Sequence, residues 1–187
     1  MGLLRTLVTL VLAGCAGVAA AQETVISDME KPNWDFYGGV KLKKVPAEGV
    51  PGGTMIEADV LKKGSNFWDA AAVSQPIKAI GKGKIVTLGF FARAASDDGP
   101  VWLNANVGRI EAPYDTAIIA RVKLDQEARF YCVEGVSKID LANKAGKVTL
   151  HLAGEKQKID LGPFLVTVRD EQDGPGQLPC AVRLGSW

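Results

Sequence analysis

Histidine is almost absent from this sequence, and its scarcity limits the chemistry that the chain can perform. The 187 residues contain one histidine, His151. Metal centres built on several histidines are therefore excluded. A Ser-His-Asp triad would have to use His151, which lies within an expected strand, and no Gly-x-Ser-x-Gly segment carries a nucleophile. The glycines of segment 81–84 lack the spacing of a phosphate-binding loop. We expect no catalytic centre of these kinds.

An excess of charge of one sign is also missing. Lysine and arginine together number 22, against 21 for aspartate and glutamate. No strongly basic surface follows from this balance, so nucleic acid is not an expected partner. Internal repeats and low-complexity linkers are missing as well, which favours a single domain.

Only the N-terminus has a long apolar run. It is uncharged, covers residues 6–21 and follows Arg5. It ends in Ala19-Ala20-Ala21, the small-x-small pattern that signal peptidases accept. Because a membrane span needs about 20 residues, the run is short for an anchor. We expect residues 1–21 to be a signal peptide, with export to the periplasm or the extracellular space.

A second way of processing the N-terminus stays open. Leu12-Ala13-Gly14-Cys15 resembles a lipobox, and acylation of Cys15 would give an outer-membrane lipoprotein. Only in that case is a membrane an expected partner. The apolar run continues past Cys15 to Ala21, which favours cleavage there.

Cysteine is scarce in the expected mature chain, where only Cys132 and Cys180 remain. An even pair in an exported protein is typical of a disulfide. Two separate buried thiols are the alternative.

Alternation of apolar and polar residues dominates the rest of the chain, as in segments 86–93, 118–124 and 148–152. A period of two is that of a half-buried strand. Further strands are expected at residues 24–27, 40–45, 54–61, 70–77, 101–107, 128–136 and 158–169. One short helical turn is expected within 137–145. The pattern predicts an all-β fold, a two-sheet antiparallel β-sandwich over residues 22–169, followed by an irregular tail over 170–187.

One polar strand face has the composition of a sugar-binding surface. Trp102, Asn104 and Asn106 alternate with apolar residues. An indole ring stacks on the C–H face of a pyranose, and amides donate to and accept from hydroxyl groups. Other candidate sugar contacts lie on polar strand faces or in a nearby loop: Arg93, His151 and Tyr114. An ordinary solvated sheet face is the alternative.

A pair of carboxylates allows a third interpretation. Glu57 and Asp59 alternate on one strand face, and glycoside hydrolysis needs two carboxylates across a cleft. Lys62 stands where a third acid would complete a Glu-x-Asp-x-x-Glu strand.

Three parts of the chain resemble the carbohydrate-binding module superfamily that includes families 4, 9 and 22. Segment 66–76, with Phe67-Trp68-Asp69, resembles its Trp-Asp strand. Segment 80–94 resembles its Gly-Lys-x-Tyr-Thr-Leu-Ser-Phe-Trp-Ala-Lys/Arg-Ala signature. Segment 148–164 resembles its closing pair of strands. The resemblance covers roughly residues 24–169.

The resemblance implies a galactose-binding-like jelly roll that binds a poly- or oligosaccharide without catalysis, as an accessory to glycoside hydrolases. It adds Trp68 as a sugar contact. Glu30 and Asp160 occupy the places of ligands to a structural calcium, and oxygen ligands suit calcium; two surface carboxylates are the alternative. The sequence departs from the family at Ala71, where a ligand-facing glutamine is common, and at Val86, where the signature has tyrosine.

Three hypotheses follow. The first is an exported, non-catalytic polysaccharide-binding domain. The second is an envelope structural or protein-interaction protein on the same fold, which the loss of glutamine at Ala71 favours. The third is a small glycoside hydrolase that uses Glu57 and Asp59.

Overall fold

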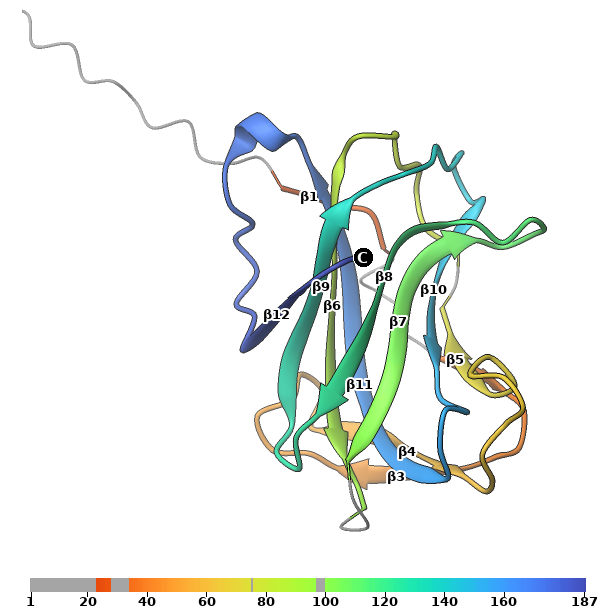
Figure 1. Ribbon diagram of the computed structural model, residues 1–187. Coiled ribbons are helices and arrows are strands. Elements are labelled where there is room, and N and C mark those ends of the chain that lie inside the picture. Colours follow the sequence, from red (N-terminus) through yellow and green to blue (C-terminus); the bar gives the residue numbers. More distant parts are fainter. Residues whose placement is uncertain (1–22, 28–33, 75, 97–99) are drawn as a thin grey trace, which may run out of the picture.

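The computed structural model describes residues 23–27, 34–74, 76–96 and 100–187. Their strands form two sheets that pack face to face (Figure 1). One sheet has seven strands in the order β12-β9-β6-β11-β4-β3, with β1 beside β11, and the other has five in the order β2-β5-β10-β7-β8. The strands are β1 Thr24–Val25, β2 Asp35–Tyr37, β3 Val40–Pro46, β4 Thr54–Val60, β5 Ala71–Val73, β6 Ile85–Ala94, β7 Val101–Arg109, β8 Thr116–Leu124, β9 Arg129–Val136, β10 Gly146–His151, β11 Gln157–Arg169 and β12 Val182–Gly185.

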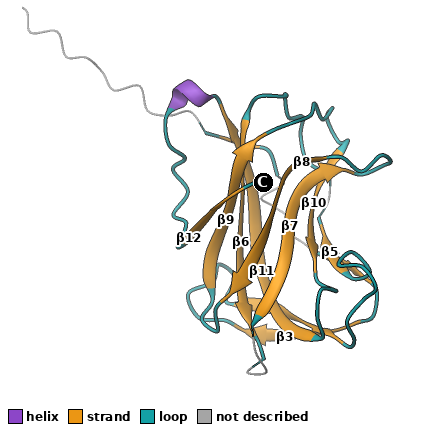
Figure 2. Ribbon diagram, viewed as in Figure 1, coloured by secondary structure: helices purple, strands orange, loops and turns teal. Residues whose placement is uncertain are grey.

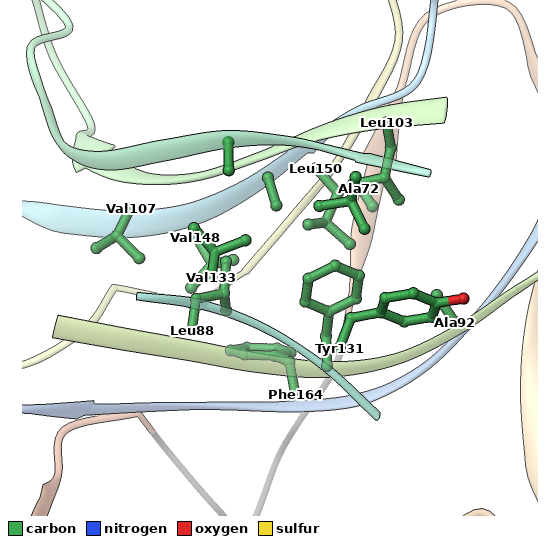
Figure 3. Packing of buried hydrophobic residues seen from close by; sticks show 14 of the residues in the cluster. Ala72, Leu88, Ala92, Leu103, Val107, Tyr131, Val133, Val148, Leu150 and Phe164 are labelled. Atoms are coloured by element: carbon green, nitrogen blue, oxygen red, sulfur yellow. The ribbon is translucent and has the colours of Figure 1, made fainter. Parts of the chain in front are cut away.

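The core lies between the two sheets and is filled by alternate residues of the long strands. Figure 3 shows Leu103 and Leu150 of the five-stranded sheet facing Leu88 and Tyr131 of the seven-stranded sheet. Each fully buried side chain of this size stabilises the fold by about 1.5–3 kcal/mol relative to exposure. Since one face of each strand is committed to this core, the other face of the five-stranded sheet is left for polar and aromatic side chains.

The predicted two-sheet β-sandwich is confirmed, and Figure 2 shows one short helix, at Glu171–Asp173, among strands and loops. The helical turn expected within residues 137–145 is wrong. Leu141 instead pairs with Ile80 in an isolated bridge. Strand β5 is shorter than predicted, because the Ser74 hydroxyl accepts a hydrogen bond from the backbone N–H of Val148 as the chain leaves the sheet.

The C-terminal segment is more regular than the sequence suggests. Residues 182–185 form β12, which runs parallel to β9, so the prediction of an irregular tail is wrong there. The structure joins Cys132 of β9 to Cys180 in a disulfide, with a Cα–Cα distance of 5.6 Å. Figure 1 shows the C-terminus beside β8 and β9.

Hydrogen bonds from the last two residues bridge the two sheets. The Ser186 N–H donates to the Glu134 carbonyl on β9. The Trp187 N–H donates to the Ile119 carbonyl on β8. The tail therefore covers the β9 edge of one sheet and the β8 edge of the other. Nowhere in the described ranges is a helix long and apolar enough to cross a membrane.

Candidate functional site: a groove on the five-stranded sheet

Two adjacent hollows on the outer face of the five-stranded sheet form a groove, and they meet at Phe67 and His151. The larger hollow has a volume of about 660 Å³ and the smaller about 190 Å³. The larger is lined by Tyr37, Phe67, Trp68, Asn106, Gly108, Arg109, Ile110, Tyr114, Thr116, Ile119, Lys147, Thr149 and His151. The smaller is lined by Phe67, Trp102, Leu103, Asn104, Arg121, His151, Gly154 and Glu155.

Strand register brings the predicted polar residues together along the floor of this groove. In β7, the core takes Leu103, Ala105 and Val107, which directs the residues between them outward. Asn104 lies between His151 on β10 and Arg121 on β8. Of the predicted sugar contacts, six line the groove: Trp68, Trp102, Asn104, Asn106, Tyr114 and His151.

The two amides form a buried layer beneath the groove surface. Asn104 is 7% exposed and Asn106 is 5% exposed, although both lie on the outer face. The Asn106 Nδ2 lies 3.2 Å from Nδ1 of His151, and the Arg121 Nε donates to Oδ1 of Asn104 at 3.4 Å. The two amides therefore help to orient His151 and Arg121 at the groove surface.

Aromatic rings stand above this polar floor. Trp68 is 49% exposed, and Tyr37 and Tyr114 are also exposed. The ring of Trp68 lies outside the core and lines the larger hollow. Tyr114 has a φ of 58°, a left-handed conformation that is uncommon for a tyrosine.

A tight turn presents Phe67 and Trp68 at its tip. The backbone N–H of Asn66 donates to Oδ2 of Asp69 at 3.0 Å, and the Asp69 N–H donates back to the Asn66 carbonyl. The hydrogen bond from the Asn66 backbone lowers the pKa of the Asp69 carboxyl, so this acceptor stays ionised. Gly38 passes so close beneath the turn that a Cβ there would lie 2.3 Å from the Asp69 carbonyl.

Trp102 is held from behind by a buried glutamine that the sequence did not reveal. The Gln157 Oε1 accepts from the Trp102 N–H, and its Nε2 donates to the Trp102 and Leu152 carbonyls at 2.7 and 2.8 Å. The glutamine amide thus satisfies backbone groups at the ends of β7 and β10. With its backbone fixed, the indole of Trp102 is 37% exposed beside the smaller hollow.

His151 is neutral over most of the physiological pH range. Burial, and then the positive charge of Lys147, lower the pKa of His151 from 6.5 to about 4. With the Asn106 amide as donor, Nδ1 accepts and the proton of the neutral ring is on Nε2. The rings of Phe67 and His151 are packed in a T-shaped arrangement, with 5.2 Å between their centroids.

This pKa makes a prediction about stability. In the unfolded chain the His151 imidazole takes up a proton near pH 6.5, whereas in the folded protein it does so only near pH 4. Stability is therefore complete above pH 6.5 and falls as the pH drops towards 4, by about 3 kcal/mol. Urea unfolding at pH 7.5 and pH 4 should show this loss in the wild type and not in His151→Gln. Equal losses in both proteins would contradict the assignment.

Arg93 does not join the groove. It lies on β6, in the seven-stranded sheet, where its Nε is 2.6 Å from Oδ2 of Asp160. Arg93 was a candidate sugar contact because it lies on a polar strand face, but its strand is in the other sheet from Trp102. Alternation assigns a residue to a face and does not say in which sheet its strand lies.

The predicted calcium site stays a prediction, since Glu30 lies outside the described residues. Asp160 is almost fully buried, and one of its oxygens is already paired with the Arg93 guanidinium. Within the described ranges, three or more acidic, histidine or cysteine side chains nowhere cluster as a metal site would require. The other oxygen of Asp160, Oδ1, is buried without a hydrogen-bond partner among the described residues.

The carboxylate pair of the hydrolase hypothesis lies away from the groove. Glu57 and Asp59 are on the outer face of β4, in the seven-stranded sheet, where Glu57 pairs in register with Asp160. The two acids do not line either hollow of the groove.

A third hollow, of about 340 Å³, opens on the outer face of the seven-stranded sheet around Phe91, Phe130 and Pro163. Its lining side chains are apolar, so it offers a sugar few hydrogen bonds.

Several groove residues were missed from the sequence. Tyr37 belongs to β2, which is too short to show alternation. Phe67 was noticed only as part of a motif. Arg121 and Lys147 lie at polar positions of alternating strands, and that alternation was the available signal for them.

No family model matches the chain, and no curated protein matches its sequence. Solved structures do match. The second N-terminal cellulose-binding domain of Cellulomonas fimi β-1,4-glucanase C has a TM-score of 0.54 and 24% identity, covering 84% of this chain and 99% of that one. A CBM4 structure has a TM-score of 0.51 and 20% identity, covering 73% and 90%.

A further match is the CBM22-1 xylan-binding domain of Paenibacillus barcinonensis Xyn10C, with a TM-score of 0.50 and 13% identity, covering 81% and 97%. At these identities the likeness establishes the fold. The chain has the jelly-roll β-sandwich of these carbohydrate-binding modules, so the resemblance noted in its sequence is confirmed for the fold.

Proposed function

We propose that the protein is an exported, non-catalytic domain that binds a polysaccharide chain in the groove of its five-stranded sheet. The observation that carries the proposal is the composition of that groove: exposed aromatic rings stand over a floor of hydrogen-bonding groups. The shared fold with cellulose- and xylan-binding domains supports it. Export is supported by the N-terminal sequence alone.

The groove offers both kinds of contact that a sugar requires. Trp68 and Trp102 present apolar faces on which the C–H groups of a pyranose can stack. Burial, and then the charge of Asp69, raise the pKa of Tyr37, so its hydroxyl stays protonated and can donate. The Nε2–H of His151 supplies a further donor.

Binding without hydrolysis is supported by the scarcity of acids in the groove. Among the described residues that line the two hollows, Glu155 is the only carboxylate. Its Oε1 is 2.7 Å from Nζ of Lys63, so this carboxylate is already in an ion pair. Acid–base hydrolysis of a glycosidic bond needs two carboxyl groups flanking it.

The proposal is tested with the purified chain against a panel of soluble β-glucans, xylans and galactans. We expect retarded migration in affinity electrophoresis and a calorimetric binding heat with at least one of them. Recovery of a protein partner in a pull-down, together with no binding to any glycan, would instead support the envelope interaction protein. Release of reducing sugar from a bound glycan would contradict the non-catalytic assignment.

A further inference from the structure

The three strands that floor the groove carry basic residues and no acidic ones. Strands β7, β8 and β10 contain Arg109, Arg121, Lys123 and Lys147, together with His151, and neither aspartate nor glutamate. In a chain whose positive and negative residues nearly balance, this separation of charge is local to the groove.

The outer face of the other sheet shows the opposite arrangement. There, cations and carboxylates lie in register on neighbouring strands: Lys43 faces Glu57 and Asp160 faces Arg93, while Glu57 and Asp160 are also in register with each other. Asp59 lies between Lys41 and Lys158. Cross-strand pairs of opposite charge stabilise a sheet, and like charges on neighbouring strands destabilise it. The seven-stranded sheet therefore neutralises its own charges, while the groove does not.

Three of the basic residues on these strands lack a carboxylate partner among the described residues. Among the described residues, the ion pairs include none formed by Lys147, Arg121 or Lys123. Arg121 and Lys123 are exposed, and Nζ of Lys123 lies 6.0 Å from the ring centre of Trp102.

The acids beside the groove are bound to neighbouring groups or lie on an edge strand, although the charge of Asp69 still acts on Tyr37. Asp115 is 3.8 Å from Arg109, and Glu155 is bound to Lys63. Asp69 accepts the hydrogen bonds of its own turn, and Asp35 is on the edge strand β2. The charge of Lys147 is felt inside the groove, since it contributes to the lowered pKa of His151.

The unpaired cations stand towards opposite ends of the groove. Lys147 and His151 are four residues apart on β10, and Arg121 lies in the same cross-strand row as His151. At 3.2–3.4 Å per residue, the two ends are separated by about 13 Å along the strands. This span exceeds one sugar ring, so a bound chain would meet positive charge at more than one ring.

We propose that the groove selects an anionic polysaccharide, one whose rings carry carboxylate or sulfate groups, with Lys147 and Arg121 as the residues that determine this specificity. The proposal rests on the proposed function of the groove and adds the chemical class of its ligand. A negatively charged substituent would form charge-assisted hydrogen bonds with Lys147 and Arg121, which are stronger than those of neutral hydroxyl groups. Unlike a neutral chain, it would also relieve the repulsion among the groove cations.

The test compares chains that differ only in charge. A soluble β-1,4-glucan oligosaccharide is titrated beside the same chain oxidised to a polyuronate and the same chain sulfated at its primary hydroxyls. A second pair consists of an unsubstituted xylan oligosaccharide and one with glucuronate branches. We expect at least one anionic chain to bind about tenfold or more tightly than its neutral counterpart, and the comparison of uronate with sulfate identifies the anion.

Varying the salt concentration and substituting the cations shows whether binding depends on the charge of the polysaccharide or on its shape. Raising sodium chloride from about 0.05 M to about 0.5 M should weaken binding of the anionic chain and leave the neutral chain unaffected. Lys147→Gln and Arg121→Gln should each lower affinity for the anionic chain about tenfold, as expected for a charged hydrogen bond. Lys43→Gln, on the other sheet, is the matched control and should change nothing.

The outcomes distinguish this proposal from the proposed function. If a neutral chain binds as tightly as its anionic counterpart, the anionic specificity is wrong and polysaccharide binding stands. If no chain of either kind binds, the proposed function fails and this specificity fails with it.

Discussion

Replacing Trp68 and Trp102 together by alanine is expected to weaken polysaccharide binding at least about 100-fold. Trp68 lines the larger hollow and Trp102 lines the smaller one, and the two hollows meet at Phe67 and His151. Truncating a tryptophan at the centre of a binding surface commonly costs about 2 kcal/mol or more. A chain that spans both hollows would lose a stacking platform at each end.

The same double substitution should leave the fold intact. Trp68 is 49% exposed and Trp102 is 37% exposed, so little core packing is lost, and surface substitutions usually change stability by less than about 0.5 kcal/mol. Calorimetric titration gives the affinity, and thermal unfolding checks stability. Trp187→Ala is the control, because Trp187 is exposed but does not line the groove. Wild-type affinity in the double variant would contradict the assignment of the groove.

Loss of the disulfide is expected to lower the free energy of unfolding by about 4 kcal/mol. Cys132 and Cys180 are separated by 48 positions, and closing a loop of that length removes conformational entropy from the unfolded chain in proportion to the logarithm of its length. In a domain of this size the midpoint of thermal unfolding should fall by about 8–16 °C. The double variant Cys132→Ala/Cys180→Ala and the reduced wild type should behave alike.

The disulfide also holds the tail over two sheet edges. Without it, β12 is attached to β9 by a strand of four residues and by the ion pair of Arg183 with Glu134. Exchange of the backbone N–H groups of Ala181, Ser186 and Trp187 should accelerate, because their hydrogen bonds tie the tail to β9 and β8. Exposed edges are sites of aggregation, so the reduced protein should also aggregate more readily on heating. Unchanged exchange and an unchanged midpoint would contradict this role.

Apolar–polar alternation along the strands predicted much of the fold and part of the candidate site. The alternation in β7 correctly placed Trp102, Asn104 and Asn106 on one face, because a strand that contributes to the core must turn its other residues outward. The same rule placed His151 and Arg121 on polar faces. What alternation cannot supply is the order of strands in a sheet.

Strand order explains the residues that were misplaced or missed. Arg93 shows the same alternation as His151, yet β6 belongs to the other sheet. The burial of Asn104 and Asn106 results from neighbours on β10 and β8 that are distant in sequence. Tyr37 joins the groove through a three-residue strand, and β12 is a four-residue strand that pairs with β9. Each of these depends on contacts between segments far apart in the chain.

The four tryptophans provide the most direct test of the central claim, that the groove of the five-stranded sheet is the binding site. Each indole N–H gives its own signal in a two-dimensional ¹H–¹⁵N spectrum. On saturation with a bound polysaccharide, the signals of Trp68 and Trp102 should shift. The signal of Trp34 should not, because its indole donates to the Gly162 carbonyl of the seven-stranded sheet at 2.8 Å. A shift of Trp34 with no change at Trp68 or Trp102 would contradict the account.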